Sequence, residues 1–86
     1  DDLVFAFDSA QRGAAASVAR QLRAAGRSVE LVLEDRKVKW AFKRADRVGA
    51  ARVVLVAPDE WQRGEVRVKD LVSGTEANIK IEELVQ

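Results

Sequence analysis

Residues 52–57, Arg-Val-Val-Leu-Val-Ala, are the strongest β-strand signal in the sequence. A run of apolar residues of this length predicts a strand that is buried on both faces. Pro58 ends the run, because proline has no amide hydrogen to donate to a sheet. Before this strand the chain alternates apolar runs with amphipathic segments, and after it polar and apolar residues alternate one by one. The strand therefore separates two kinds of structure.

The N-terminal half predicts the order strand, helix, strand, helix. Residues 3–7 and 29–33 are short apolar runs of the kind found in buried strands. From residue 10 to 25 apolar residues recur every three or four positions, which predicts a helix that ends before Gly26. A second predicted helix ends at Gly49 and has a buried stripe made of Val38, Ala41, Phe42, Ala45 and Val48. Because helical crossovers join parallel strands, three parallel strands are expected.

The C-terminal part predicts a β-hairpin. Residues 65–71 and 77–81 alternate polar and apolar side chains, and Ser73-Gly74 supplies a turn between them. The polar face of this hairpin carries Glu65, Arg67, Lys69, Asn78 and Lys80. Residues 82–86 are predicted to begin a last short helix. The expected fold is an α/β domain over residues 1–86, with a mixed five-stranded sheet (three parallel strands plus the C-terminal hairpin) and about three helices.

Composition excludes most kinds of catalytic chemistry. The 86 residues suffice for one domain and include no cysteine and no histidine, so disulfides, thiolate zinc sites and histidine-based catalysis are excluded. Phosphate-binding glycine loops are absent, and the paired carboxylates at 1–2, 59–60 and 82–83 have no cleft signal beside them. We therefore expect no catalytic residue and no metal ligand. No apolar run approaches the ~18 residues of a membrane span, and methionine is absent, so we expect a piece of a longer chain.

The charge of the chain is concentrated in one segment. The net charge is only +1, but residues 36–58 hold seven basic side chains and one acidic one, for a local +6. Such a block predicts an anionic partner that meets one surface of the protein. The ordinary alternative is a solvated helix face that binds nothing.

A helical projection places the cations of the second predicted helix opposite its buried stripe. This outer face collects Arg36, Trp40, Lys43, Arg44 and Arg47. An indole among cations suits unpaired nucleotides, since it offers a flat surface for a base beside charges that neutralise phosphate. The alternative is that Trp40 borders the stripe and packs under a loop. Trp61, in the segment after Pro58, is interpreted as a lid over one end of the core.

Three further polar residues flank one edge of the predicted sheet. Glu60 can accept hydrogen bonds from the amino or imino groups of a base, and Lys69 can donate to a carbonyl or a phosphate. Arg67 lies on the same hairpin face as Lys69. Each of these residues alone is an ordinary surface charge, and together they form a candidate binding site.

The chain carries an extended pattern with recognisable spacing. Its parts are Leu22-Arg23-x-x-Gly26-x-x-Val29-Glu30, Lys37-x-Lys39-x-x-Phe42-Lys43-x-Ala45-Asp46-x-x-Gly49-Ala50 and Gly64-x-Val66-x-Val68-Lys69-Asp70-Leu71-x-Ser73-Gly74. In order and spacing they resemble the C-terminal anticodon-binding domain of histidyl-tRNA synthetases, over about residues 15–84. Synthetases for threonine, proline and glycine share this domain, but the Phe-Lys-x-Ala-Asp and Val-Lys-Asp-Leu segments favour histidine.

The resemblance implies a function and a set of contacts. The domain would grip the GUG anticodon of histidine tRNA for a ligase whose catalytic domain, with ATP and magnesium, lies outside this chain. That parent would be a homodimer in the cytoplasm or an organelle, whereas this piece is not itself an enzyme. The family's base-contacting glutamate and basic residue match Glu60 and Lys69. Lys39, Lys43, Arg44 and Arg47 would bind phosphate, and Trp40 departs from the lysine that many bacterial members carry.

Two other interpretations remain open from the sequence. The first alternative to the ligase is that the same domain acts as a regulatory module that senses tRNA, in a stress kinase or another synthetase paralogue. A signalling receiver domain also has an α/β order with early acids and a late lysine. In a receiver, however, the acid pair follows the first strand, whereas Asp1 and Asp2 precede Leu3 here.

Overall fold

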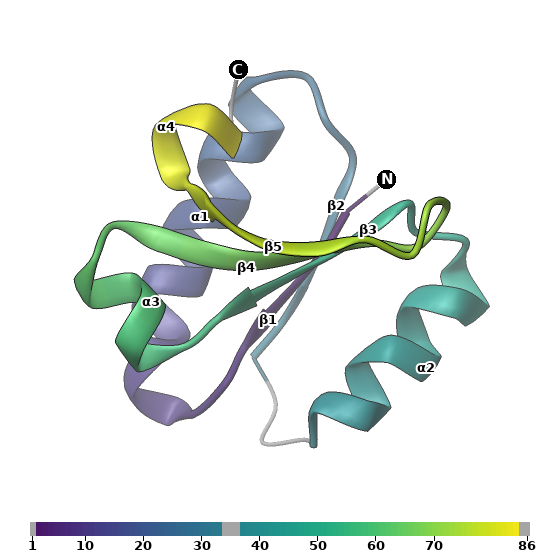
Figure 1. Cartoon of the computed structure of the whole chain (residues 1–86), viewed down its shortest axis with the longest axis horizontal. Helices are drawn as coiled ribbons and strands as arrows, with labels where there is room; N and C mark the ends of the chain where they lie inside the picture. Colours follow the sequence, from purple (N-terminus) through teal and green to yellow (C-terminus); the bar gives the residue numbers. More distant parts are fainter. Residues whose placement is uncertain (1, 34–36, 85–86) are drawn as a thin grey trace.

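The computed structural model describes residues 2–33 and 37–84, and its frame is one mixed sheet (Figure 1). The strands are β1 (Asp2–Ala6), β2 (Val29–Val32), β3 (Arg52–Val56), β4 (Glu65–Asp70) and β5 (Glu76–Lys80). They are ordered β2-β1-β3-β4-β5 across the sheet. β1 runs parallel to both β2 and β3, whereas β4 is antiparallel to β3 and to β5. The predicted combination of three parallel strands and a C-terminal hairpin is confirmed.

Four α-helices occur in the described residues, where about three were expected. They are α1 (Arg12–Ala24), α2 (Val38–Val48), α3 (Pro58–Gln62) and α4 (Ile81–Leu84), and a 3-10 turn at Ser9–Gln11 precedes α1. The additional helix is α3, in a segment without a predicted element. Its start is nevertheless encoded, since proline is favoured at the first helical position and Asp59 and Glu60 suit a helix N-terminus. Arg36 and residues 85–86, which the predicted second and last helices included, lie outside the described residues.

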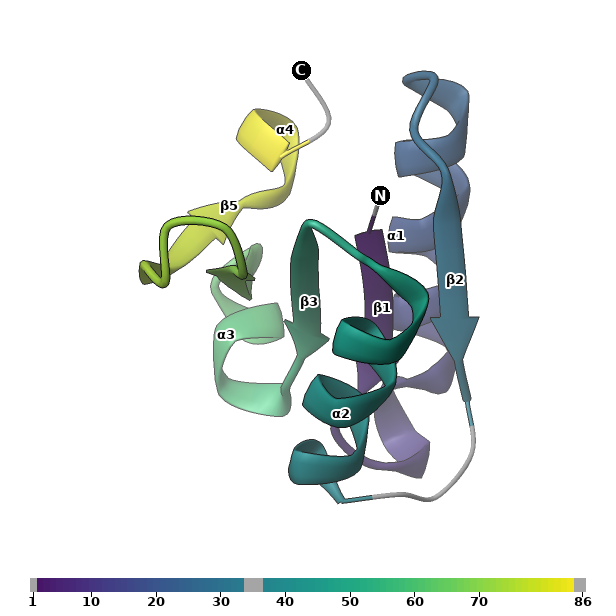
Figure 2. The same ribbon diagram turned by 90° about the vertical axis from the view of Figure 1, so that its right-hand side faces the viewer.

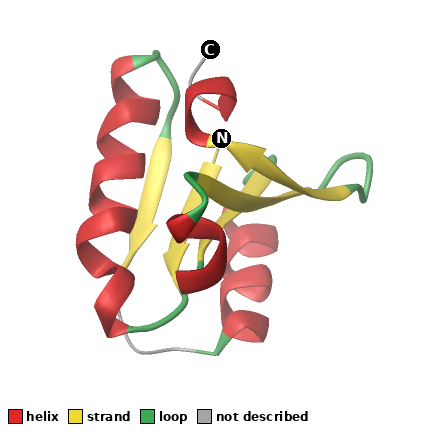
Figure 3. Cartoon of the chain, turned by 60° about the vertical axis from the view of Figure 1, so that its left-hand side comes forward, coloured by secondary structure: helices red, strands yellow, loops and turns green. Residues whose placement is uncertain are grey.

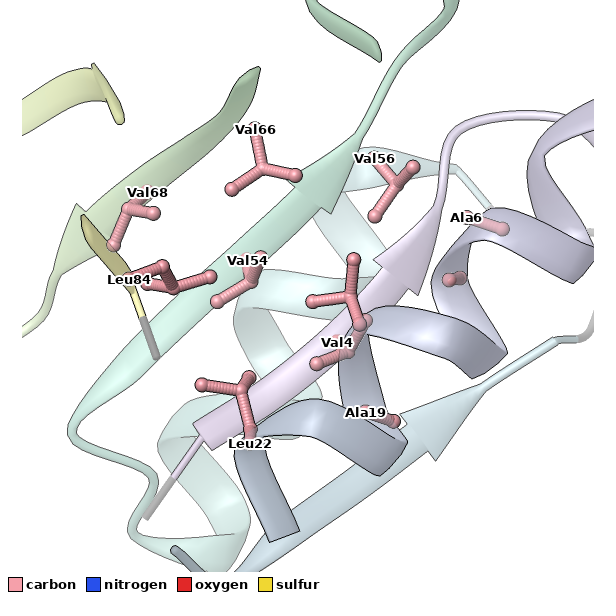
Figure 4. Close-up of a cluster of buried hydrophobic side chains, with 11 residues drawn as sticks. Val4, Ala6, Ala19, Leu22, Val54, Val56, Val66, Val68 and Leu84 are labelled. Atoms are coloured by element: carbon pink, nitrogen blue, oxygen red, sulfur yellow. The ribbon is translucent and has the colours of Figure 1, made fainter. Parts of the chain in front are cut away.

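Helices cover the two faces of the sheet unequally, as Figures 2 and 3 show. On one face α1 and α4 pack over a cluster that includes Val4, Val54 and Val56 (Figure 4). On the other face Leu3, Phe5 and Leu55 pack against α2. The central strand β3 is therefore buried on both faces, as its apolar run predicts. Among the residues that the structure describes, no helix covers the α2 side of β4 and β5, so that side of the hairpin is open within this part of the chain.

The predicted buried stripe of α2 is only partly right. Ala41 and Ala45 are fully buried, but Val38 and Phe42 are only partly buried and Val48 is exposed. The two alanines let the helix approach the sheet closely at its centre. Because α2 lies beside the open hairpin face rather than beneath another layer, the flanks of its stripe remain accessible.

A buried ion network fixes the first strand. The Asp2 carboxylate has no exposed side-chain surface and accepts two hydrogen bonds from Arg27, at 2.6 and 2.9 Å, and two from Arg52, both at 2.9 Å. Burial alone would raise the pKa of Asp2, but the hydrogen bonds from Arg52 and Arg27 outweigh it and lower this pKa. Asp2 therefore joins β1 to β3 and to the loop before β2, a structural role that was not predicted from the sequence.

Acid is expected to destabilise the fold through this network. A carboxylate whose folded pKa is depressed stabilises the native state above its ordinary pKa, near 3.8 for Asp2, and loses this contribution as the pH falls through the lowered value. The hydrogen bond from Arg44 lowers the pKa of Glu30, and backbone amides of Ser73 and Val72 lower that of Asp70, so both act in the same direction. Urea unfolding at a series of pH values should show a free energy of unfolding that declines below about pH 4. A free energy that stays level down to about pH 2 would contradict this assignment.

Candidate nucleic-acid interface

The open face of the hairpin carries the polar residues predicted for it. Leu55 pairs with Arg67 and Val53 pairs with Lys69 in the antiparallel ladder between β3 and β4. Directly paired residues project to the same face of a sheet. Since Val53 and Leu55 face α2, Arg67 and Lys69 project on the α2 side as well. The hairpin thus continues the sheet beyond α2 as a polar surface.

A hollow of about 200 Å³ lies where this surface meets α2. It is smaller than the ~300–1,000 Å³ pockets of drug-sized ligands, so it suits one flat ring rather than a whole nucleotide. Its apolar walls come from the C-terminal ends of β1 and β3 and from α2, and its polar groups come from α3 and the hairpin. The lining residues are Phe7, Val38, Phe42, Leu55 and Ala57, together with Glu60, Arg67, Lys69 and Glu76.

The charged groups of the hollow are held by specific partners. The Lys69 ammonium lies 5.3 Å from the centre of the Phe42 ring, a cation–π distance. Glu60, whose side chain is 15% exposed, has Oε2 3.7 Å from Nη2 of Arg63. Arg67 Nε lies 3.3 Å from Glu76 Oε1. The lining of the hollow therefore combines acceptors, donors and aromatic rings, and its formal charges sum to zero. RNA-binding proteins use stacking and hydrogen-bonding groups of these kinds for unstacked bases.

Aromatic surface is available at the rim as well. Phe7 follows the last residue of β1 and is 52% exposed. Its backbone amide donates to the carbonyl of Val56 at 3.0 Å, which fixes it beside the end of β3. Its half-exposed ring offers a flat apolar surface for stacking.

The outer surface of α2 is basic but not uniformly available. Lys39, Lys43 and Arg47 are exposed. Arg44 is partly buried and makes a bidentate pair with Glu30 of the edge strand β2, at 2.8 and 3.1 Å. Three of the four cations predicted to bind phosphate are thus open to solvent, while Arg44 already has a carboxylate partner.

Trp40 lies at the border of the buried stripe, which is the second of the two placements considered for it. Its side chain is partly buried and packs against the cluster beneath α2. With Lys43, Arg44 and Arg47 it lines a shallow depression of about 130 Å³. Trp40 therefore borders the buried stripe instead of standing free among the cations. Trp61, partly buried against the cluster on the α1 side, fits the lid predicted for it.

The predicted site residues fall into two groups on opposite flanks of α2. Glu60, Arg67 and Lys69 share the hollow with Phe42, whereas Trp40 and its neighbouring cations line the other depression. At 100° per residue, Trp40 and Phe42 project about 200° apart around the helix axis. Lys39 and Lys43 project between Trp40 and Phe42 on the exposed side of the helix, and Lys43 also lines the depression beside Trp40.

Only Glu60, Arg67 and Lys69 among the lining residues of the hollow were predicted as site residues; Phe7 and Glu76 are two of those that were not. For Phe7 there was no usable signal, because an aromatic residue in an apolar run predicts burial. For Glu76 a signal did exist. It lies two residues before Asn78 and four before Lys80, so extending the alternation of polar and apolar residues by one position places it on the same polar face. Interpreting it as part of the turn left it out.

The described residues were also compared with the requirements of a metal site and of a membrane-spanning helix. Among residues 2–33 and 37–84, no group of three or more acidic side chains is arranged to hold a metal ion. None of the helices in these ranges is long and apolar enough to cross a membrane.

Comparison with known sequences identifies one matching family model and relatives that share one name. Residues 3–86 match the family model described as "Anticodon binding domain". The chain is 49% identical over 84 residues to the chloroplastic/mitochondrial histidine–tRNA ligase of Arabidopsis thaliana, covering 98% of this chain and 17% of that protein. It is 37% identical over 70 residues to a histidine–tRNA ligase of Bacillus velezensis, covering 81% of this chain and 16% of that protein. The chain thus spans about a sixth of the relatives it matches.

Solved structures agree with the sequence relatives. A histidyl-tRNA synthetase from Nostoc superposes with a TM-score of 0.93 at 27% identity, over 98% of this chain and 20% of that one. The RNA-binding domain of a threonyl-tRNA synthetase from Cryptosporidium parvum superposes with a TM-score of 0.91, over 99% of this chain and 22% of that one. Its 13% identity shows a common fold only.

Proposed function

The chain belongs to the anticodon-binding domain family, and from this premise we propose that it binds the anticodon loop of histidine tRNA for a histidine–tRNA ligase. The observation that carries the proposal is the hollow beside α2, which gathers Glu60, Arg67 and Lys69 against aromatic rings. The relatives that match over most of the chain are named histidine–tRNA ligases, which favours the ligase over a regulatory tRNA sensor.

For the parent protein we propose ATP-dependent attachment of histidine to tRNA, with ATP and magnesium bound outside this chain and the protein acting as a homodimer. The compartment is proposed as the cytoplasm or an organelle, and the Arabidopsis relative is named chloroplastic/mitochondrial. The present chain contributes affinity and discrimination and no catalytic group.

The geometry suggests how a base is read. A base that enters the hollow stacks at the rim against Phe7, while its polar edge meets Glu60 and Lys69. The Glu60 carboxylate accepts hydrogen bonds, and the Lys69 ammonium donates to a carbonyl oxygen. Guanine offers both kinds of partner, with ring and amino N–H donors beside the O6 acceptor. Two of the three bases of a GUG anticodon are guanines.

Phosphates are proposed to follow the outer surface of α2. Lys39, Lys43 and Arg47 are exposed there, on the same helix as Phe42 of the hollow, and Lys43 and Arg47 also line the depression beside Trp40. Contacts to phosphate position the RNA without reading its sequence, whereas contacts to base edges discriminate. Arg44 and Trp40, which border this surface, contribute where the strand passes the far flank of the helix.

The direct test is a titration of the chain with a stem-loop that carries the GUG anticodon, followed by amide chemical shifts at fixed moderate salt. Shifts are expected at Glu60, Arg67, Lys69 and along α2, and weaker ones with a loop of altered anticodon. Equal shifts with both loops would reduce the function to non-specific RNA binding. Absence of shifts with either loop would contradict RNA binding by this chain.

A further inference from the structure

Glu76 is a carboxylate in the midst of groups proposed to bind a polyanion. It begins β5, pairs directly with Lys69 on β4 and lines the hollow. Its Oε1 lies 3.3 Å from Arg67 Nε, and the two side chains are 41% and 50% exposed. Ion pairs as exposed as this one contribute little to stability. Stability therefore gives no strong reason for a carboxylate at this place.

The effect of Glu76 on the charge of the hollow is larger. Arg67 and Lys69 are balanced by Glu60 and Glu76, so the hollow is neutral as it stands. Without the Glu76 carboxylate it would carry +1 and would attract phosphate as the outer surface of α2 does. A nucleobase is uncharged, so a neutral hollow does not oppose its entry. Excluding the wrong group by charge is a common route to specificity.

We propose that Glu76 is a specificity-determining residue, whose carboxylate neutralises Arg67 and keeps phosphate out of the hollow so that a base can occupy it. This inference rests on the proposed function of the hollow. Glu60, the more buried carboxylate, meets the base inside. Glu76 acts against the RNA backbone at the more exposed position. The two carboxylates of the hollow thus have different tasks.

The test compares the chain with its Glu76→Gln variant, which removes the charge and preserves the shape. Dissociation constants are measured for the GUG stem-loop and for a loop of altered anticodon at several salt concentrations. Glu82→Gln is the matched control, because Glu82 is exposed on α4, which packs on the other face of the sheet. Circular dichroism melting verifies that each variant is folded.

Glu76→Gln is expected to tighten binding of the altered loop about five- to tenfold, through a new charge-assisted contact between Arg67 and phosphate. The GUG loop should gain less, so that discrimination falls. The slope of log affinity against log salt should steepen by about 0.7, as for one additional phosphate contact on a single strand. Glu82→Gln should change neither discrimination nor slope appreciably.

The double variant Arg67→Gln/Glu76→Gln makes the hollow neutral again and should return the salt slope to that of the unmodified chain. If Glu76→Gln changes discrimination and salt slope no more than Glu82→Gln does, while the unmodified chain prefers the GUG loop, the role proposed for Glu76 is wrong but the proposed function stands. A salt slope that stays steep in the double variant would overturn the role of Glu76 too. If the unmodified chain does not prefer the GUG loop, the proposed function fails, and this inference fails with it.

Discussion

Replacing Asp2 by asparagine is expected to lower the free energy of unfolding by about 3 kcal/mol, within the range for breaking a buried ion pair. The carboxylate is fully buried and neutralises two guanidinium groups, Arg27 and Arg52, whose side chains are 35% and 19% exposed. An asparagine retains the shape but not the charge. Arg27 can then turn toward water, while Arg52 stays largely enclosed beside an uncharged partner. The loss is large for a domain of this size.

Urea unfolding at neutral pH measures this loss, and Asp46→Asn is the matched control. Asp46 is exposed on α2, so the same chemical change there should alter stability by no more than about 0.5 kcal/mol. A double-mutant cycle with Arg52→Gln should yield a coupling energy of about 0.5–3 kcal/mol. Equal stability of the Asp2 and Asp46 variants would show that the network does not hold the fold together.

Replacing Lys69 by alanine is expected to reduce the preference for the GUG loop over an altered loop by about 1–3 kcal/mol. The Lys69 ammonium lies over the Phe42 ring inside the hollow, where it is positioned to meet a base edge. Lys43→Ala is the contrasting variant, because Lys43 lies exposed on the outer surface of α2. It should weaken binding of both loops alike and lower the salt slope by about 0.7.

Dissociation constants of both variants for both loops, at several salt concentrations, separate the two roles. The unfolding midpoints of the two variants should stay close to that of the unmodified chain, since neither side chain is buried. If Lys69→Ala and Lys43→Ala weaken both loops by the same factor, then no division exists between reading bases and holding phosphates.

Most of the fold could be predicted from the pattern of apolar and polar residues. The apolar run at 52–57 predicts a strand buried on both faces, and β3 is one. The period of the apolar residues changes from three or four to two after Pro58, and this change marks the passage from crossover helices to the hairpin. The short helix α3 was not predicted, because five residues are too few to display a helical period.

The candidate site could be predicted from the sequence only in part. Glu60, Arg67 and Lys69 were singled out separately, and the structure brings them together in one hollow. For Trp40 the sequence left two placements open, among the exposed cations or at the border of the buried stripe, and the structure shows the second, with the ring packed against the cluster beneath α2. Phe7 resembled a core residue and is half exposed, because the strand ends one residue before it.

The order and type of the main elements, the two-sided burial of the central strand and the absence of histidine and cysteine chemistry all follow from local periodicity and composition. The pairing of the charges does not follow from these and is seen only in the folded chain. Arg44 meets Glu30, Arg67 meets Glu76, and Asp2 meets Arg52 from 50 residues away. Such pairings depend on the order of the strands in the sheet and on their register. Neither can be predicted from the spacing of residue types along the sequence.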